Sequence, residues 1–141
     1  MRNEQTLLMA LFYAVPILVQ AQVDITITGS TAVRAEAYYA IRSMYELNLV
    51  SQNPLHDASG QKQVTFSGTI PSLFGGQTVA VRTSYSACDS GIHALTANLL
   101  VPFLSSATPG VATTVSLSCD FAFSEVFQGV SSYTSPALQD N

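Results

Sequence analysis

The stretch from Val23 to Arg34 most constrains the fold, because it reads as a strand, a tight turn and a helix start in direct succession. Apolar and polar residues alternate from Val23 to Thr28, which is the two-residue period of a β-strand, and Gly29 ends this alternation. The hydroxyls of Ser30 and Thr31 are typical helix caps. Since a helix start presents free N–H groups and partial positive charge, the sequence predicts an anion site here.

Composition excludes several classes of protein. The chain is 48% hydrophobic and 10% charged, so it can form a core and is not disordered. Lys and Arg number five against nine acidic residues, too few cations for a surface that binds nucleic-acid phosphates. No Walker loop, Gly-x-Gly-x-x-Gly fingerprint or Cys/His spacing for zinc occurs, so we expect neither a cofactor nor a bound metal.

The first 21 residues resemble a secretory signal peptide. Arg2 precedes an apolar run from Thr6 to Val19, and Val19-Gln20-Ala21 places small residues at the cleavage positions. The alternative is a membrane anchor, but crossing a bilayer takes about 20 apolar residues and Gln20 ends this run early. We therefore expect a periplasmic or extracellular protein that begins near Gln22 and has no stable membrane span after signal removal.

Alternation and helical spacing predict the remaining elements. We expect a helix over 32–50, a surface connection over 51–60, strands over 63–70 and 78–84, a helix over 92–104, weak alternation over 111–118 and a short buried strand over 119–127. This order is that of an α/β fold with a mostly parallel sheet flanked by helices. Such sheets bind ligands beyond the carboxyl ends of their strands.

Three predicted strand ends are rich in hydroxyl groups. They are Thr28-Gly29-Ser30-Thr31-Ala32, the serine-rich turn that ends in Asp89-Ser90-Gly91, and Asp120-Phe121-Ala122-Phe123-Ser124-Glu125. In order, spacing and context these segments resemble the three anion-binding segments of periplasmic phosphate-binding proteins that serve ABC transporters. The resemblance covers residues 22–127 and implies one lobe of that fold, with 128–141 as a polar tail or a truncated crossover to a missing second lobe.

The resemblance implies a ligand set for phosphate or a similar oxyanion, and an ABC transporter permease as protein partner. The implied ligands are Ser30, Thr31 and Ala32 in the first loop, Ser90 with Gly91, or alternatively Ser86, in the second, and Ser124 with Glu125 in the third. A carboxylate in the site would accept the proton of hydrogen phosphate, whereas sulfate offers no proton. The family has Asp where this chain has Glu125, so the fit of the longer side chain decides the selectivity.

The family's second lobe supplies further ligands, and a mature chain of this length has room for one lobe only. We therefore expect either a fragment or a one-lobed relative that binds phosphate weakly by itself. The alternative function is an exported structural or surface-interaction domain that keeps the scaffold and binds no ligand.

Several other residues have two interpretations. Arg34 either faces the ligand or is solvated, whereas for Arg82 a structural ion pair or a sheet-edge position is favoured over ligand contact. Cys88 and Cys119 are the only possible disulfide pair, and strand geometry predicts that they lie too far apart to bridge. His93 could join a nucleophile arrangement with Cys88 or Ser90, but a histidine at the edge of the core is favoured, so we expect no enzymatic activity.

Overall fold

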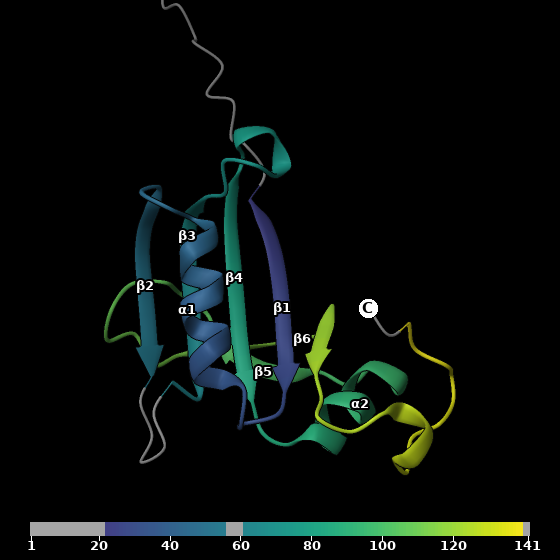
Figure 1. Ribbon diagram of the computed structural model, residues 1–141. Helices are drawn as coiled ribbons and strands as arrows, with labels where there is room; N and C mark the ends of the chain where they lie inside the picture. The colour runs from purple at the N-terminus through teal and green to yellow at the C-terminus, as the bar shows by residue number, and fades with distance from the viewer. Residues whose placement is uncertain (1–21, 56–60, 140–141) are drawn as a thin grey trace, which may run out of the picture.

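A computed structural model describes residues 22–55 and 61–139 (Figure 1). The predicted signal peptide (1–21), the loop residues 56–60 with His56, and residues 140–141 lie outside the described residues. In the described part the elements are β1 (Val23–Gly29), α1 (Arg34–Met44), β2 (Leu49–Leu55), β3 (Gln63–Thr69), a 3-10 turn (Phe74–Gly76), β4 (Thr78–Tyr85), α2 (Cys88–Thr96), β5 (Val101–Leu104), β6 (Thr114–Leu117), β7 (Phe121–Phe123) and a second 3-10 turn (Gln128–Val130).

The main sheet has the strand order β2-β3-β4-β1-β7, and β5 pairs with β6 in a separate hairpin. β1 runs parallel to both β4 and β7, whereas β3 runs antiparallel to β2 and β4. The predicted α/β class is therefore confirmed at the level of a mixed sheet with helices. The prediction of a mostly parallel sheet is wrong, because residues 49–69 contribute an antiparallel strand pair that adds to β4.

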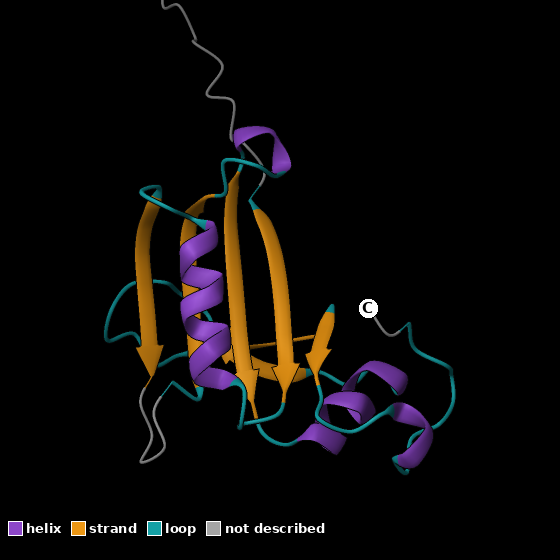
Figure 2. Ribbon diagram, in the orientation of Figure 1, coloured by secondary structure: helices purple, strands orange, loops and turns teal. Residues whose placement is uncertain are grey.

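The sheet lies between two layers of different kinds. α1 packs across one face, while the β5–β6 hairpin lies behind the other (Figure 2). On that second face the Thr65 hydroxyl donates to the carbonyl of Leu104 at 2.9 Å. The core lies beneath α1 and contains Ile27, Ala37, Ile41, Tyr45, Val64, Phe66, Ile70, Val79, Val81 and Tyr85. Alternate residues of β1, β3 and β4 therefore form the core, as the period-2 pattern predicts.

α1 is shorter than the predicted helix at both ends. It begins at Arg34, and its N-cap residue Val33 makes no side-chain capping bond. The Ser30 hydroxyl instead accepts the N–H of Ala32 at 3.1 Å, within the turn that precedes the helix, so the predicted capping role of Ser30 and Thr31 is wrong. At the other end the positive φ of Glu46 (52°) turns the chain away from the helix.

The predicted surface connection at 51–60 is in part a strand. β2 forms the outer edge of the sheet, where Pro54 is tolerated because its missing N–H costs no ladder bond on the open side. Asn53 is buried and bonds to the carbonyls of Ser106 and Val111, at 3.1 and 2.7 Å. This strand is polar because one face contacts a loop rather than the apolar core.

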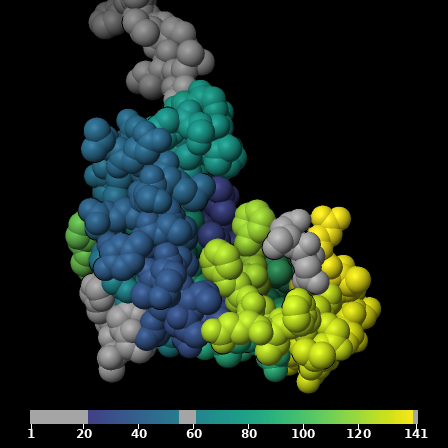
Figure 3. Space-filling view, viewed as in Figure 1, coloured from purple at the N-terminus to yellow at the C-terminus, as the bar shows by residue number. Residues whose placement is uncertain are grey.

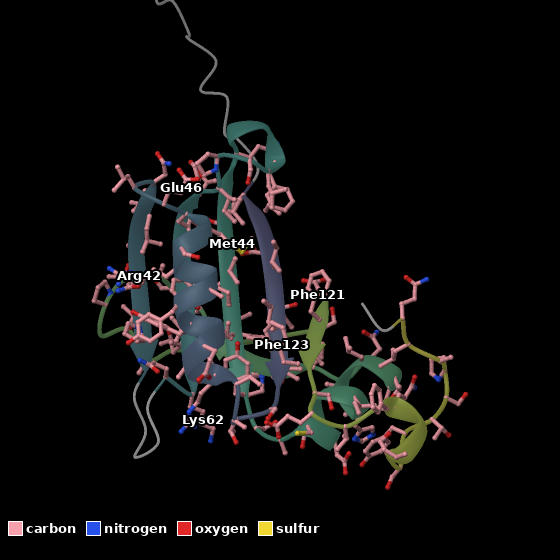
Figure 4. The ribbon with its side chains drawn as sticks, viewed as in Figure 1. Arg42, Met44, Glu46, Lys62, Phe121 and Phe123 are labelled. Carbon is pink, nitrogen blue, oxygen red and sulfur yellow. The ribbon has the colours of Figure 1, made fainter. Side chains whose placement is uncertain are left out.

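The second half of the chain also departs from the prediction. α2 spans Cys88–Thr96 instead of 92–104, and the last residues of the predicted helix form β5. β7 is not buried: Phe121 is 56% exposed and Phe123 is 42% exposed at the edge of the sheet (Figure 4). Apolar character in this segment therefore does not mark a core strand.

Candidate functional site

The carboxyl ends of β1, β4 and β7 meet at one edge of the sheet. The N–H of Ser30 donates to the carbonyl of Phe123 at 2.7 Å, and the N–H of Ser86 donates to the carbonyl of Gly29 at 3.0 Å. In Figure 3 the lime-green residues that follow Asp120 lie against the purple-blue atoms at the start of α1. The structure thus brings the backbones of the three hydroxyl-rich segments together.

The first segment offers few groups to a ligand. Ser30 is 2% exposed, and both its N–H and its hydroxyl oxygen are engaged within the protein. Thr31 and Ala32 are exposed at the same edge, just before α1. A ligand here would therefore meet the Thr31 hydroxyl and backbone groups rather than the Ser30 side chain.

The second segment is the uncapped start of α2. Ala87 occupies the N-cap position with an extended backbone and no side-chain capping bond. The first helical donor is the N–H of Gly91, which bonds to the carbonyl of Ala87 at 3.1 Å, so the N–H groups of Cys88, Asp89 and Ser90 have no partner within the helix. Three backbone donors and the positive end of the helix dipole therefore meet at this point.

Gly91 has a packing role. It is buried, and a Cβ at this position would lie 2.7 Å from the Cα of Gly29 and 3.1 Å from the Cβ of Ala122. Since its N–H is used inside the helix, Gly91 offers no polar donor to a ligand. The absence of a side chain lets α2 approach the end of β1.

The third segment places a carboxylate beside α2. Oε2 of Glu125 accepts a weak hydrogen bond from the Cys88 thiol, with 3.6 Å between oxygen and sulfur. The Ser124 hydroxyl bonds locally to Val126, donating to its carbonyl at 2.8 Å and accepting its N–H at 3.2 Å. Glu125 is thus the exposed member of this segment that reaches toward the start of α2, where an acidic group is favoured by the helix dipole.

The side chains of these segments face two different hollows. Asp89 and Ser90 line a hollow of about 770 Å³, whereas Ser124 and Glu125 line a separate one of about 320 Å³. Residues two apart on a helix point to different sides, so Cys88 can face Glu125 while Ser90 faces the larger hollow. The backbones of the three segments therefore meet at one edge of the sheet, whereas the side chains of Ser90 and Glu125 line different hollows.

Reciprocal hydrogen bonds between Asp120 and Thr26, here called the Asp120–Thr26 clasp, fix the third segment to β1. The sequence alone did not indicate this contact. Oδ2 of Asp120 accepts the N–H and the hydroxyl of Thr26, at 2.8 and 2.9 Å. In return the N–H of Asp120 donates to the carbonyl and the hydroxyl oxygen of Thr26, both at 3.0 Å. Thr26 lies inside a strand and Asp120 in a distant turn, so no local pattern relates them.

Lys62 is a second residue that the sequence analysis missed. It precedes β3 and is exposed at the edge where β1 and β4 end (Figure 4), and it lines the larger hollow with Ser86 and Ser90. The N–H of Tyr85, at the end of β4, donates to the Lys62 carbonyl at 2.9 Å. Because β3 is antiparallel to β4, the start of one strand lies beside the end of the other. The only available sequence signal was a cation next to a strand start.

The contacts of Arg82 are those of a structural residue. Arg82 forms an ion pair with Asp24 at 3.2 Å and donates to the carbonyl of Leu104 at 2.6 Å, which confirms the structural interpretation of this arginine.

Cys88 and Cys119 are free thiols. Burial, with a smaller contribution from the neighbouring Asp120 carboxylate, raises the pKa of Cys119 to about 11. Among the described residues, no group of three or more His, Cys, Asp and Glu side chains could hold a metal ion.

Comparison with models of protein families, with curated proteins and with solved structures finds no match for this chain. Neither helix in the described ranges, 22–55 and 61–139, is long and apolar enough to cross a bilayer.

Proposed function

We propose that this chain is an exported solute-binding protein, or a part of one, that binds phosphate or a similar oxyanion and delivers it to an ABC transporter permease. The observation that carries the proposal is the uncapped start of α2, where the N–H groups of residues 88–90 have no partner within the helix, Ser90 lies in the first turn and Glu125 contacts Cys88. The first loop is bonded to the third at this edge, through Ser30 and Phe123. A small anion here would receive several backbone hydrogen bonds at once.

Glu125 provides the selectivity in this proposal. Its carboxylate would accept the O–H of hydrogen phosphate and repel the fully ionised sulfate. Its contact with the Cys88 thiol keeps the side chain near the helix start, where that proton would be presented.

The expected affinity is low. Thr31, Ala32, Ser90 and Glu125 are all exposed, so water competes for every hydrogen bond to the anion. We expect a dissociation constant on the order of 1 mM for inorganic phosphate, equivalent to about 4 kcal/mol of binding free energy.

Amide chemical shifts give a direct test at this affinity. Phosphate is titrated into ¹⁵N-labelled protein and compared with sulfate at matched ionic strength. We expect saturable shifts at Thr31, at residues 88–90 and at Glu125, and weaker shifts with sulfate. Shifts that are equal for both anions and scattered over the surface would contradict the proposal.

Three variants sharpen the test. Ser90→Ala should weaken binding of both anions about fivefold, the value of about one hydrogen bond. Glu125→Gln should remove the preference for phosphate over sulfate. Ser72→Ala is the matched control, because Ser72 is exposed in the turn before β4, at the opposite end of that strand. Equal affinity in all three variants would contradict the assignment of the site.

A second candidate function, an exported interaction domain without a ligand, is favoured by one observation. Large apolar side chains are exposed along β7 and the segment after it, namely Phe121, Phe123, Val126, Phe127 and Val130. A ligand that binds only the folded state must raise the melting temperature. An unchanged melting temperature throughout a phosphate series into the tens of millimolar range, well above the expected dissociation constant, would favour this second function.

A further inference from the structure

The larger hollow beside Ser90 exceeds what a bare anion needs. Its volume of about 770 Å³ lies within the range of about 300–1,000 Å³ that is typical of pockets for drug-sized organic ligands. Phosphate has only five heavy atoms, so it would fill a small part of this space. The size of the hollow therefore points to a ligand with a larger remainder.

Part of the lining of the hollow is polar and includes a cation. Lys62, Ser86 and Ser90 line it and are exposed, and their side chains form no hydrogen bond or ion pair with any residue that the structure describes. The uncapped first turn of α2 adjoins this part, since Ser86 and Ser90 flank its start. Charge complementarity therefore favours an anionic group at this part of the hollow.

Another part of the lining is apolar. It consists of Leu99 and Leu100, which lie between α2 and β5, and of Val101 and Pro102 at the start of β5, and Leu100 is 67% exposed. Tyr133 also lines the hollow, with its ring stacked on that of His93 at a centroid distance of 4.1 Å and an interplanar angle of 6°. Carbon atoms of a ligand that covered these side chains would remove apolar surface from water.

We propose that this hollow binds an organic oxyanion of the phosphate-monoester or phosphonate class. The charged head group lies between Lys62 and the start of α2, and the carbon-rich remainder covers Leu100 and its neighbours. This inference rests on the proposed function, because Ser90 and the same helix start hold the head group in both. It goes beyond that function in naming an organic ligand instead of a bare anion.

Asp89 is the acidic residue that lines the hollow, and it bears on the affinity. Its carboxylate is exposed on the first turn of α2, where it repels an incoming anion through a water-screened interaction. Asp89→Asn should therefore tighten binding of phenylphosphonate about two- to threefold, and the effect should be larger at low salt, where fewer ions screen the repulsion.

Calorimetric titration with three probes tests the inference: phenylphosphonate, inorganic phosphate and phenol, at one ionic strength. Phenylphosphonate should bind at least about tenfold more tightly than phosphate, because the ring covers apolar surface in addition to the head-group contacts. Phenol should show no measurable binding, since it lacks the charge.

Two variants locate the site. Leu100→Ala should reduce the preference for phenylphosphonate about threefold or more, since the exposed leucine belongs to the apolar part of the lining. Leu47→Ala is the matched control, because Leu47 is fully exposed in the turn between α1 and β2. Both substitutions affect exposed side chains, so neither should prevent folding.

Each outcome separates the inference from the proposed function. Equal binding of phenylphosphonate and phosphate would overturn the inference and leave the proposed function standing. Absence of binding by both anions would overturn both proposals. Binding of phenol as tight as that of phenylphosphonate, or a preference unchanged in Leu100→Ala, would overturn the inference, because the ligand would then not use the head-group contacts or this hollow.

Discussion

Replacing Gly91 by alanine tests the packing that brings the start of α2 to the end of β1. The new methyl group would lie 2.7 Å from the Cα of Gly29, which is closer than real Cβ atoms approach other heavy atoms. Gly29 has little freedom to move: its carbonyl accepts the N–H of Ser86, and the Phe123 carbonyl occupies the place where its own Cβ would be. The strain would therefore fall on α2.

Two opposing contributions decide how much Gly91→Ala changes the free energy of unfolding. Alanine is about 1 kcal/mol more favourable than glycine within a helix. Against this, overpacking a well-packed site costs about 1–3 kcal/mol, and the upper part of that range applies because the nearest atom is backbone. We expect Gly91→Ala to lower the free energy of unfolding by about 1–2 kcal/mol and to shift the first turn of α2 away from the edge.

Urea denaturation measures the decrease in the free energy of unfolding, and amide exchange of Ser86 reports locally on its hydrogen bond with Gly29. Gly129→Ala is the control, since a Cβ there meets nothing within 4 Å and the change should stay within about 0.5 kcal/mol. If Gly91→Ala were as stable as the wild type or more stable, helix propensity would dominate and the close approach of α2 to Gly29 would be refuted.

Three further predictions concern the Asp120–Thr26 clasp, the half-buried thiol of Cys119 and the buried hydroxyl of Tyr45. Asp120→Asn should weaken the bonds to Thr26 by about 1 kcal/mol, because a neutral acceptor replaces a carboxylate; unchanged amide exchange of Thr26 would count against the clasp. Cys119, with a pKa raised to about 11, should react with iodoacetamide near pH 8 about a hundredfold more slowly than a thiol of pKa 9.0. Mass spectrometry measures the alkylation rate, and a rate for Cys119 equal to that of such a thiol would contradict this prediction. Burial raises the pKa of Tyr45 from 10.0 to about 12, so its contribution to stability is complete below pH 10 and is lost as the pH rises toward 12. Tyr45→Phe should therefore reduce the alkaline loss of stability in urea titrations, at the cost of about 1 kcal/mol for the hydrogen bond to Val79.

The central strands were predictable because each carries a strong local pattern. β1, β3 and β4 occupy nearly the predicted ranges, since one face of each lies in the core and alternation follows from that burial. β2 gave no such pattern, because its Asn53 bonds to loop carbonyls rather than packing in the core. Edge strands with polar or exposed faces leave little trace in a sequence.

The candidate site was predictable only in its outline. Hydroxyl-rich segments after three predicted strands suggested a common edge, and parallel pairing of β1 with β4 and β7 does bring them together. The facing of individual side chains could not be foreseen, because it depends on where each helix begins. α2 starts at Cys88, so Ser90 lines the larger hollow, Cys88 contacts Glu125 and Gly91 packs inward.

By itself, the sequence determined that the chain combines strands with two helices and that small, hydroxyl-bearing residues follow strand ends, because these features depend on neighbours a few positions apart. The tertiary structure alone decided that Lys62 joins this edge and that Asp120 clasps Thr26. Both depend on strand direction and on contacts between distant segments. Local periodicity carries no information about either, since the same pattern fits a parallel or an antiparallel neighbour.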